Sequence, residues 1–160
     1  MQATDLLLRK TVITDLEIFY LFQCDEKAIQ LAAFTPNDPH NKEAYLDKYS
    51  KLLIDPTINM QTILWQQSIA GSVSKYEMEG DAEITYWIDR RWWGKGIASA
   101  ALKKFLTMES ARPIFGKTAW DNIGSQKVLE HNGFKLIGKD RGFANARKME
   151  IEEFIFKLEK

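Results

Sequence analysis

One loop limits how this chain can fold. The segment Arg91-Trp92-Trp93-Gly94-Lys95-Gly96 separates an alternating, strand-like pattern at 82–88 from a helical pattern that begins at Ile97. The two glycines lack a Cβ atom, so the backbone can approach a ligand closely. A turn of this kind gathers free backbone N–H groups at the positive end of a helix dipole, where proteins bind phosphate. The loop therefore predicts a fold that mixes strands and helices, with a pyrophosphate site between a strand and a helix.

The periodicity of the rest of the chain supports a mixed sheet. Apolar residues recur at helical spacing in five segments, namely 16–22, 26–33, 42–53, 97–109 and 125–132. Alternating or short apolar runs predict strands at 6–9, 60–66, 69–76, 82–88, 114–120, 134–139 and 151–158, and the pattern at 141–149 stays open between strand and loop. This order indicates a single α/β (α+β) domain over residues 1–160, with a mixed central sheet of about six or seven strands and helices on both faces.

Composition narrows the class of partner. Lys and Arg number 22, and so do Asp and Glu, so the formal net charge is zero. This balance argues against nucleic acid as the main partner, because phosphate-backbone binding usually shows a basic excess. We find no signal-peptide pattern and no apolar run of membrane-spanning length, so we expect a cytoplasmic protein without a membrane partner. One cysteine and two histidines give no metal-ligand spacing, so we expect no metal.

Three phosphate-binding patterns compete for the loop. A P-loop would need an earlier glycine before Gly94-Lys95, which is absent. A dinucleotide fingerprint would need a third glycine where Ser99 stands, after the first strand of a βαβ unit. The pattern Arg-x-x-Gly-x-Gly is matched in full by Arg91, Gly94 and Gly96. So short a motif also occurs in ordinary glycine-rich turns and needs a second signal.

A second block supplies that signal. The stretch from Trp120 to Phe134 contains Asn122, Ser125, Val128-Leu129 and Gly133-Phe134. It resembles the Asn-x-x-Ser-x-x-Val-Leu-x-x-x-Gly-Phe block of the GNAT (Gcn5-related) N-acetyltransferases, particularly those of the RimJ/RimL kind. The opening Leu-Leu-Leu-Arg and the strand at 82–88 are also similar to that group, so the resemblance covers nearly the whole chain.

The resemblance implies a GNAT fold and an acyltransferase whose cosubstrate is acetyl-CoA. The acetyl group would pass to a primary amine, on a protein N-terminus or a small molecule, by direct attack in a ternary complex. A backbone N–H near Tyr86 to Ile88 would polarise the thioester. The implied cofactor-binding residues are Tyr86, Trp87, Ile88, Arg91, Trp92, Trp93, Gly94, Lys95, Gly96, Ile97, Ala98, Asn122 and Ser125.

Two side chains are candidates for catalysis. Glu83, on the polar face of its strand, is a candidate base for the attacking amine, and the alternative is a solvated or salt-bridged carboxylate. Many GNAT enzymes have a tyrosine where this chain has Leu129. The resemblance to the RimJ/RimL kind implies instead that Ser125 contacts the departing thiolate. Ser125 and Asn122 could instead only cap the following helix.

The missing tyrosine keeps open a non-catalytic acyl-CoA-binding or regulatory domain, and a nucleotide-binding protein is a third reading. Monomer and homodimer are equally open. We expect the pairs Lys103-Lys104 and Glu152-Glu153 to be solvated, and Tyr45 to pack in the core rather than line the acceptor pocket.

Overall fold

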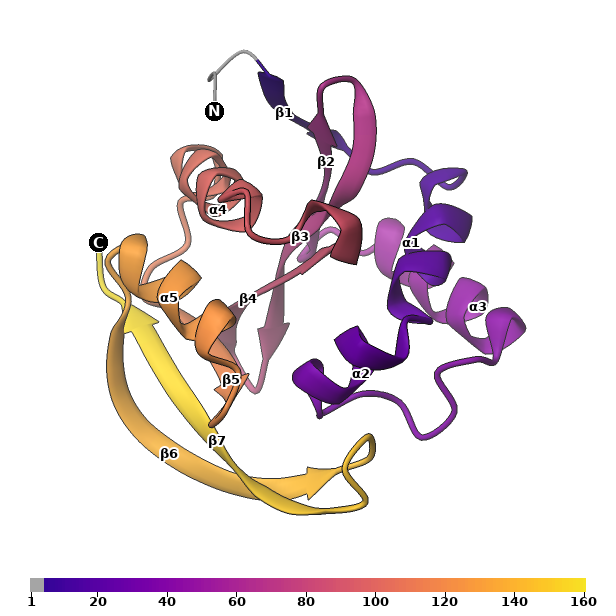
Figure 1. Ribbon diagram of the computed structural model, residues 1–160. Helices are drawn as coiled ribbons and strands as arrows, with labels where there is room; N and C mark the ends of the chain where they lie inside the picture. The colour runs from indigo at the N-terminus through magenta and orange to yellow at the C-terminus, as the bar shows by residue number, and fades with distance from the viewer. Residues whose placement is uncertain (1–4) are drawn as a thin grey trace.

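The computed structural model describes residues 5–160, so residues 1–4 of the expected domain lie outside the described part. Within it, seven strands form one mixed sheet in the order β1-β2-β3-β4-β5-β7-β6 (Figure 1). The strands are β1 (Leu6–Lys10), β2 (Asn59–Trp65), β3 (Ser68–Met78), β4 (Asp81–Ile88), β5 (Ile114–Ala119), β6 (Lys135–Ala144) and β7 (Met149–Leu158). Only β4 and β5 pair in parallel among these strands. The expected mixed sheet is confirmed.

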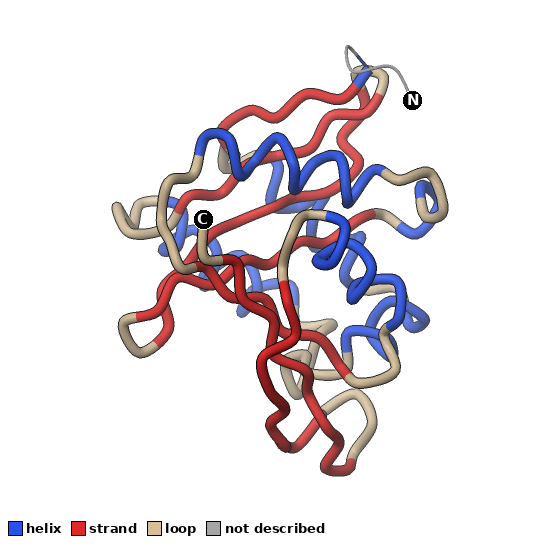
Figure 2. Tube along the Cα trace, turned by 90° about the vertical axis from the view of Figure 1, so that its left-hand side faces the viewer, coloured by secondary structure: helices blue, strands red, loops and turns tan. Residues whose placement is uncertain are grey.

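Helices cover both faces of this sheet (Figures 1 and 2). One face carries α4 (Ile97–Met108) and α5 (Ile123–His131), and the other carries α1 (Asp15–Gln23), α2 (Glu26–Ala32) and α3 (Lys42–Leu53). A short 3-10 turn, η2 (Arg90–Trp92), joins β4 to the loop before α4. No helix in residues 5–160 is long and apolar enough to cross a membrane.

Strand alternation divides the apolar side chains among three clusters, of which two pack helices against the sheet around β4. On the α4–α5 face, Leu102 and Phe105 are fully buried against sheet residues such as Val73 and Ile84. On the other face, Leu16 and Phe19 belong to a smaller cluster that includes the aromatic residues of α3. The sheet is therefore held from both sides, and β4 lies at its centre.

Several element boundaries differ from the expected ones, and two of these differences have a clear physical reason. Strand β6 continues to Ala144, because it stays paired with β7 as far as Met149, so half of the open segment 141–149 is strand. Helix α5 begins at Ile123 rather than Ser125, because the side chain of Asn122 accepts a hydrogen bond from the backbone N–H of Ser125. That contact makes Asn122 the N-cap.

Candidate active site

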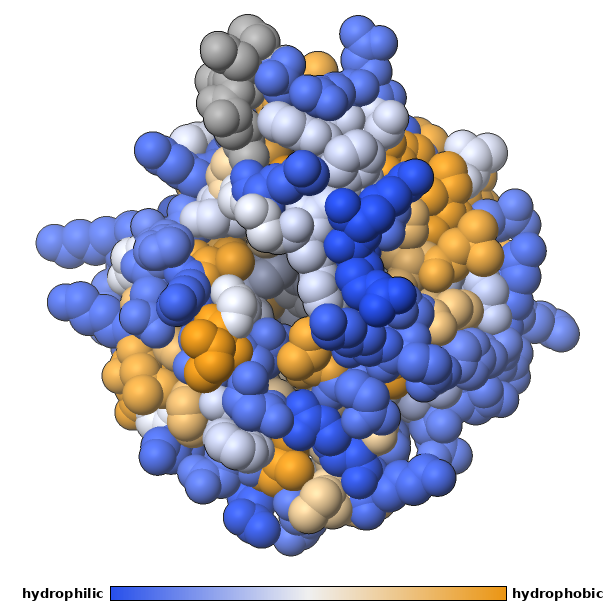
Figure 3. Space-filling view, viewed as in Figure 1, coloured by the Kyte–Doolittle hydropathy of each residue, from blue (hydrophilic) through white to orange (hydrophobic). Residues whose placement is uncertain are grey.

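The site begins where β4 and β5 separate. Their parallel pairing runs from Ala82 opposite Ile114 to Ile84 opposite Gly116, while β4 continues to Ile88. The edge of β4 beyond Ile84 is therefore not paired with β5 in the described structure. A cavity of about 60 Å³ lies at this divergence, and Figure 3 shows the surface hollowed near the middle of this face. Backbone groups at such an edge can pair with an extended ligand.

The loop after β4 is built to leave backbone N–H groups available. Gly94 and Gly96 have φ angles of 78° and 76°, in the left-handed region that favours glycine. Gly96 is the N-cap of α4 and has no side chain that could occupy the first-turn amides. In the described part of the chain, no side chain caps this end of α4, and anion binding by the amides of Ile97 and Ala98 stays a prediction.

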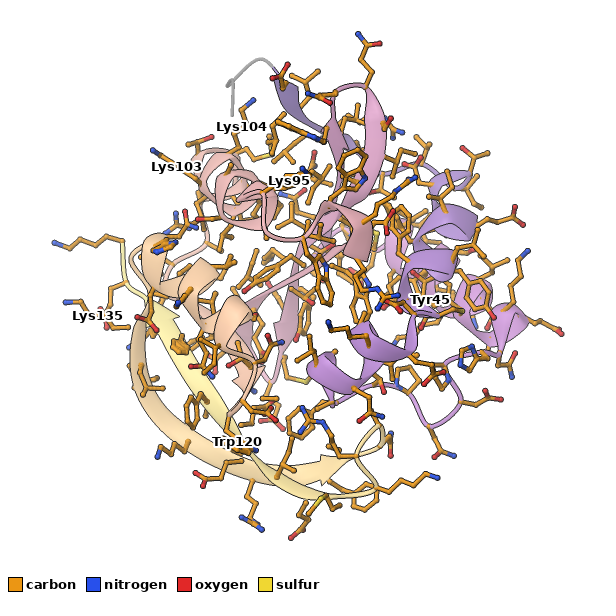
Figure 4. The ribbon with its side chains drawn as sticks, in the orientation of Figure 1. Tyr45, Lys95, Lys103, Lys104, Trp120 and Lys135 are labelled. Carbon is orange, nitrogen blue, oxygen red and sulfur yellow. The ribbon has the colours of Figure 1, made fainter. Side chains whose placement is uncertain are left out.

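The charged and aromatic residues of this loop divide between structural and exposed positions. The Arg91 Nε lies 2.6 Å from an Asp89 carboxylate oxygen, so this guanidinium is held by the loop itself. The Trp93 indole donates to the carbonyl of Ile88 at 2.9 Å. Lys95 is exposed beside α4 (Figure 4). Tyr45 lies on the other side of the molecule, among α1 and α3. Contact of Lys95 or Arg91 with a phosphate stays a prediction.

Glu83 lies on the α1–α3 face of β4 and is buried, with 4% of its surface exposed. The Tyr76 hydroxyl donates to one carboxylate oxygen at 3.1 Å, and the Lys117 ammonium lies 3.3 Å from the other. Glu83 is thus a paired, buried carboxylate rather than a solvated one. Lys117 also lines the cavity at the strand divergence, which places Glu83 one contact away from that space.

A second carboxylate lies close to this pair. Burial raises the pKa of Glu153, Lys117 opposes the rise, and Asp140 and Glu83 add to it. The expectation that Glu152 and Glu153 are both solvated is therefore wrong for Glu153, which is half-buried on β7 opposite Ala119 of β5. The matching expectation for Lys104 is also wrong, because its ammonium donates to the carbonyl of Leu6.

Tyr86 and Ser125 meet on the opposite face of β4. Their hydroxyl oxygens are 2.7 Å apart, and the Tyr86 hydroxyl is also 3.0 Å from the Ser125 carbonyl oxygen. Burial raises the pKa of Tyr86 to about 12, although the hydrogen bond with Ser125 lowers it. Leu129, one turn further along α5, is 1% exposed and lies against Gly116. Ser125 and Leu129 both line the cavity, and of the two only Ser125 brings a hydroxyl group to it.

Asn122 has a structural role at the start of α5. Its side-chain oxygen caps the helix, and its amide nitrogen donates to the carbonyl of Leu31 at 3.3 Å. The amide therefore ties α5 to the end of α2. Contact with a pantetheine chain stays a prediction for Asn122.

Sequence reasoning missed the partners of Glu83. Tyr76 could have been found, since the turn at 79–80 sets Tyr76 opposite Glu83 in the β3–β4 hairpin. Lys117 had no local signal, because it reaches Glu83 through the parallel pairing of β4 with β5, across an intervening helix. Across residues 5–160, no three His, Cys, Asp or Glu side chains gather in a way that could hold a metal ion.

The mixed sheet, with β4 and β5 separating beside a cavity, defines a class of α/β protein that comparison with known proteins identifies. The family described as acetyltransferase (GNAT) domain matches residues 5–135. The chain is 26% identical over 163 residues to an uncharacterized N-acetyltransferase, p20, of Bacillus licheniformis, covering 96% of this chain and 92% of the relative.

Solved structures show the same fold. The microcin C7 self-immunity acetyltransferase MccE, in complex with acetyl-CoA and AMP, superposes with a TM-score of 0.81 at 21% identity, covering 98% of this chain and 93% of that one. RimL, a ribosomal L7/L12 α-N-protein acetyltransferase in complex with coenzyme A, gives 0.77 at 22% identity, with 95% and 93% covered.

The chain belongs to the GNAT acetyltransferase family. It is an acyltransferase that carries out N-acetyl transfer, with acetyl-CoA as its cosubstrate.

Proposed function

We propose that this enzyme acetylates a primary amine by direct attack on acetyl-CoA, with the two faces of β4 dividing the chemistry. The observation that carries the proposal is the alternation of Glu83 and Tyr86 along one strand beside the cavity: Glu83 turns to the α1–α3 face and Tyr86 to the α4–α5 face. The attacking amine would come from the first face and the sulfur would leave on the second.

The cofactor contacts in this proposal follow from the loop and the free strand edge. The pyrophosphate would rest on the amides from Trp92 to Ala98, with Lys95 adding positive charge. The pantetheine would run along the edge of β4 at Tyr86, Trp87 and Ile88, where a backbone N–H would donate to the thioester carbonyl. Trp92 and Trp93 would flank the cofactor, and Asn122 and Ser125 would approach it from α5.

The proposed reaction transfers the acetyl group directly from sulfur to nitrogen. The amine lone pair attacks the thioester carbonyl carbon, the carbon–sulfur bond breaks, and coenzyme A leaves as a thiolate. Before the attack, the acceptor ammonium loses one proton to Glu83 through a water, because the carboxylate is one contact from the cavity. The second proton, which the nitrogen loses as the amide forms, passes to solvent water. Ser125 donates a hydrogen bond to the thiolate.

The acceptor is a cationic amine in this proposal. Glu83 and Glu153 are carboxylates on the face from which it would come, and an ammonium, that of Lys117, already lies 3.3 Å from one of them. One fold neighbour is a protein α-N-acetyltransferase and another serves microcin self-immunity, so both a protein N-terminus and a small-molecule amine are included. We also propose that residues 1–160 act as one domain in the cytoplasm, where acetyl-CoA is available.

Thiol release from acetyl-CoA in the presence of an amine panel tests this function. The panel should contain peptides with free N-termini, polyamines and amino sugars, and each amine should also be assayed as its N-acetylated form. We expect turnover with at least one free amine and none with its blocked counterpart. Release of thiol at the same rate without any amine would contradict N-acetyl transfer as the proposed reaction.

Replacing Glu83 tests its role as the base. Glu83→Gln should lower kcat about 100-fold or more, the usual contribution of a general base, while coenzyme A binding stays unchanged. The matched control is Glu77→Gln, which removes an exposed carboxylate from the neighbouring strand. Equal activity of the two variants would remove Glu83 from the mechanism.

A further inference from the structure

The pair of hydroxyl groups on the α4–α5 side of β4 has a use beyond packing. Tyr86 comes from the strand and Ser125 from the first turn of α5, and both line the cavity where β4 and β5 part. Glu83 and its ammonium partner lie on the other face of the strand. The leaving sulfur and the attacking nitrogen are therefore served by different groups, and the Tyr86–Ser125 pair is on the sulfur side.

Counting protons shows how the pair can act. A tyrosine hydroxyl and a serine hydroxyl each have one proton to donate, and each oxygen can also accept. Tyr86 has two acceptors within reach, the Ser125 side-chain oxygen at 2.7 Å and its carbonyl oxygen at 3.0 Å. When Tyr86 donates to the Ser125 side chain, the serine proton is free to point into the cavity. Chained hydrogen bonds of this kind polarise one another and strengthen the outer donor.

We propose that Tyr86 is a positioning residue for the leaving group: its hydroxyl donates to Ser125 Oγ and so directs the Ser125 proton to the sulfur of the departing coenzyme A. This inference rests on the proposed role of Ser125. The step needs no proton transfer from Tyr86, because the thiolate is stabilised by the hydrogen bond of Ser125. The raised pKa of the phenol keeps it protonated, and hence a donor, at neutral pH.

The test is a double-variant cycle on kcat. Tyr86→Phe should lower kcat by about tenfold, the equivalent of one hydrogen bond of about 1.4 kcal/mol. Ser125→Ala should lower it at least as far, and the double variant should be no slower than Ser125→Ala alone, because the tyrosine acts through the serine. The Kd for coenzyme A should stay within about twofold throughout.

The matched control is Tyr20→Phe. It also removes a hydroxyl that donates to a backbone carbonyl, that of His40 at 2.7 Å, but on α1, away from the cavity. Tyr20→Phe should keep the wild-type kcat even where it lowers the melting temperature. A kcat of Tyr86→Phe within twofold of the wild type, or losses that multiply in the double variant, would overturn the inference.

A second measurement covers the case in which Tyr86→Phe does not fold. A phenol that loses its proton can no longer donate to Ser125, so kcat should fall at high pH. A fluorinated tyrosine at position 86 keeps the ring and lowers the pKa of the phenol, so this fall in kcat should begin at a lower pH than in the wild type. An unmoved profile would also overturn the inference. If the proposed function itself fails, no amine supports turnover in the wild type or in Tyr20→Phe, and the two failures are thereby distinguished.

Discussion

At the residue scale, Asp15 shows how one buried carboxylate joins three segments. Arg9 binds it through two hydrogen bonds of 2.7 and 2.9 Å, and the backbone N–H of Val12 and the hydroxyl of Thr62 also donate to it. Burial pushes the pKa of Asp15 up, but these donors outweigh it, so the pKa is lowered. The ionised carboxylate therefore stabilises the junction of β1, α1 and β2.

This contact predicts a pH-dependent stability. Asp15→Asn should lower the free energy of unfolding by about 1–3 kcal/mol at neutral pH, because buried donors lose a charged acceptor. A depressed folded-state pKa gives stability that is present above the unfolded value near 3.9 and is lost as the pH falls through the folded value. Urea titrations at several pH values should show the variant and wild type converging toward low pH. A constant difference would assign the loss to packing.

Residue identity predicted some roles but not their partners. Glu83 and Ser125 stood out because their positions relative to the glycine loop and the second motif are set by local spacing. The neighbours that decide their chemistry, Lys117 and Tyr86, reach them across the sheet or from another element. Such contacts depend on strand order, which local periodicity does not encode.

At the scale of elements, the close approach of β3 to β4 fixes the strand that carries the site. Gly71 on β3 lies opposite Ile88, and a Cβ atom there would be 2.1 Å from the carbonyl oxygen of Trp87. Any side chain at 71 must push the end of β4 away, toward the loop that precedes α4.

Gly71→Ala should therefore weaken both stability and cofactor binding. We expect a loss of about 1–3 kcal/mol in unfolding free energy, typical of overpacking against rigid atoms, together with weaker coenzyme A binding. The control is Gly124→Ala in α5, where an added Cβ meets nothing within 4 Å and should be neutral or slightly stabilising. Denaturant titration measures the unfolding free energy, and calorimetry measures coenzyme A binding. Unchanged coenzyme A affinity in Gly71→Ala would show that the packing of β3 against β4 does not affect the site.

Most elements were predictable because each is encoded locally. Alternation gave β4, helical spacing gave α3 and α4, and glycines marked the loop between β4 and α4. The C-terminal hairpin was only partly predictable. Most residues of β6 are exposed, and its last five residues, Asp140 to Ala144, show no apolar alternation. Its strand form comes from pairing with β7, which is a tertiary effect.

At the scale of the whole molecule, the two helical layers hold a sheet that is split at its centre. A ligand that pairs with the free edge of β4 and binds the amides of α4 should stabilise the folded state. Coenzyme A at 100 times its Kd would add about 2.7 kcal/mol and should raise the melting temperature by roughly 5–10 °C for a domain of this size. NAD or ATP should give a smaller shift, and a larger one would favour a nucleotide-binding protein.

Two glycine substitutions can distinguish an effect on coenzyme A binding at the loop from an effect on overall stability. Gly94 and Gly80 both have positive φ angles, and an added Cβ meets nothing within 4 Å at either. Alanine at each should cost about 1–2 kcal/mol of left-handed strain, but only Gly94→Ala should also reduce the coenzyme A shift. If coenzyme A raised the melting temperature of both variants equally, the pyrophosphate would not bind at this loop.

A crystal structure with acetyl-CoA bound would show directly whether the opening between β4 and β5 holds the thioester. The pyrophosphate should accept hydrogen bonds from the amides at the start of α4, and the thioester should lie between β4 and β5 with its sulfur near Ser125. Acetyl-CoA bound at another surface, with the opening between these strands empty, would contradict the account.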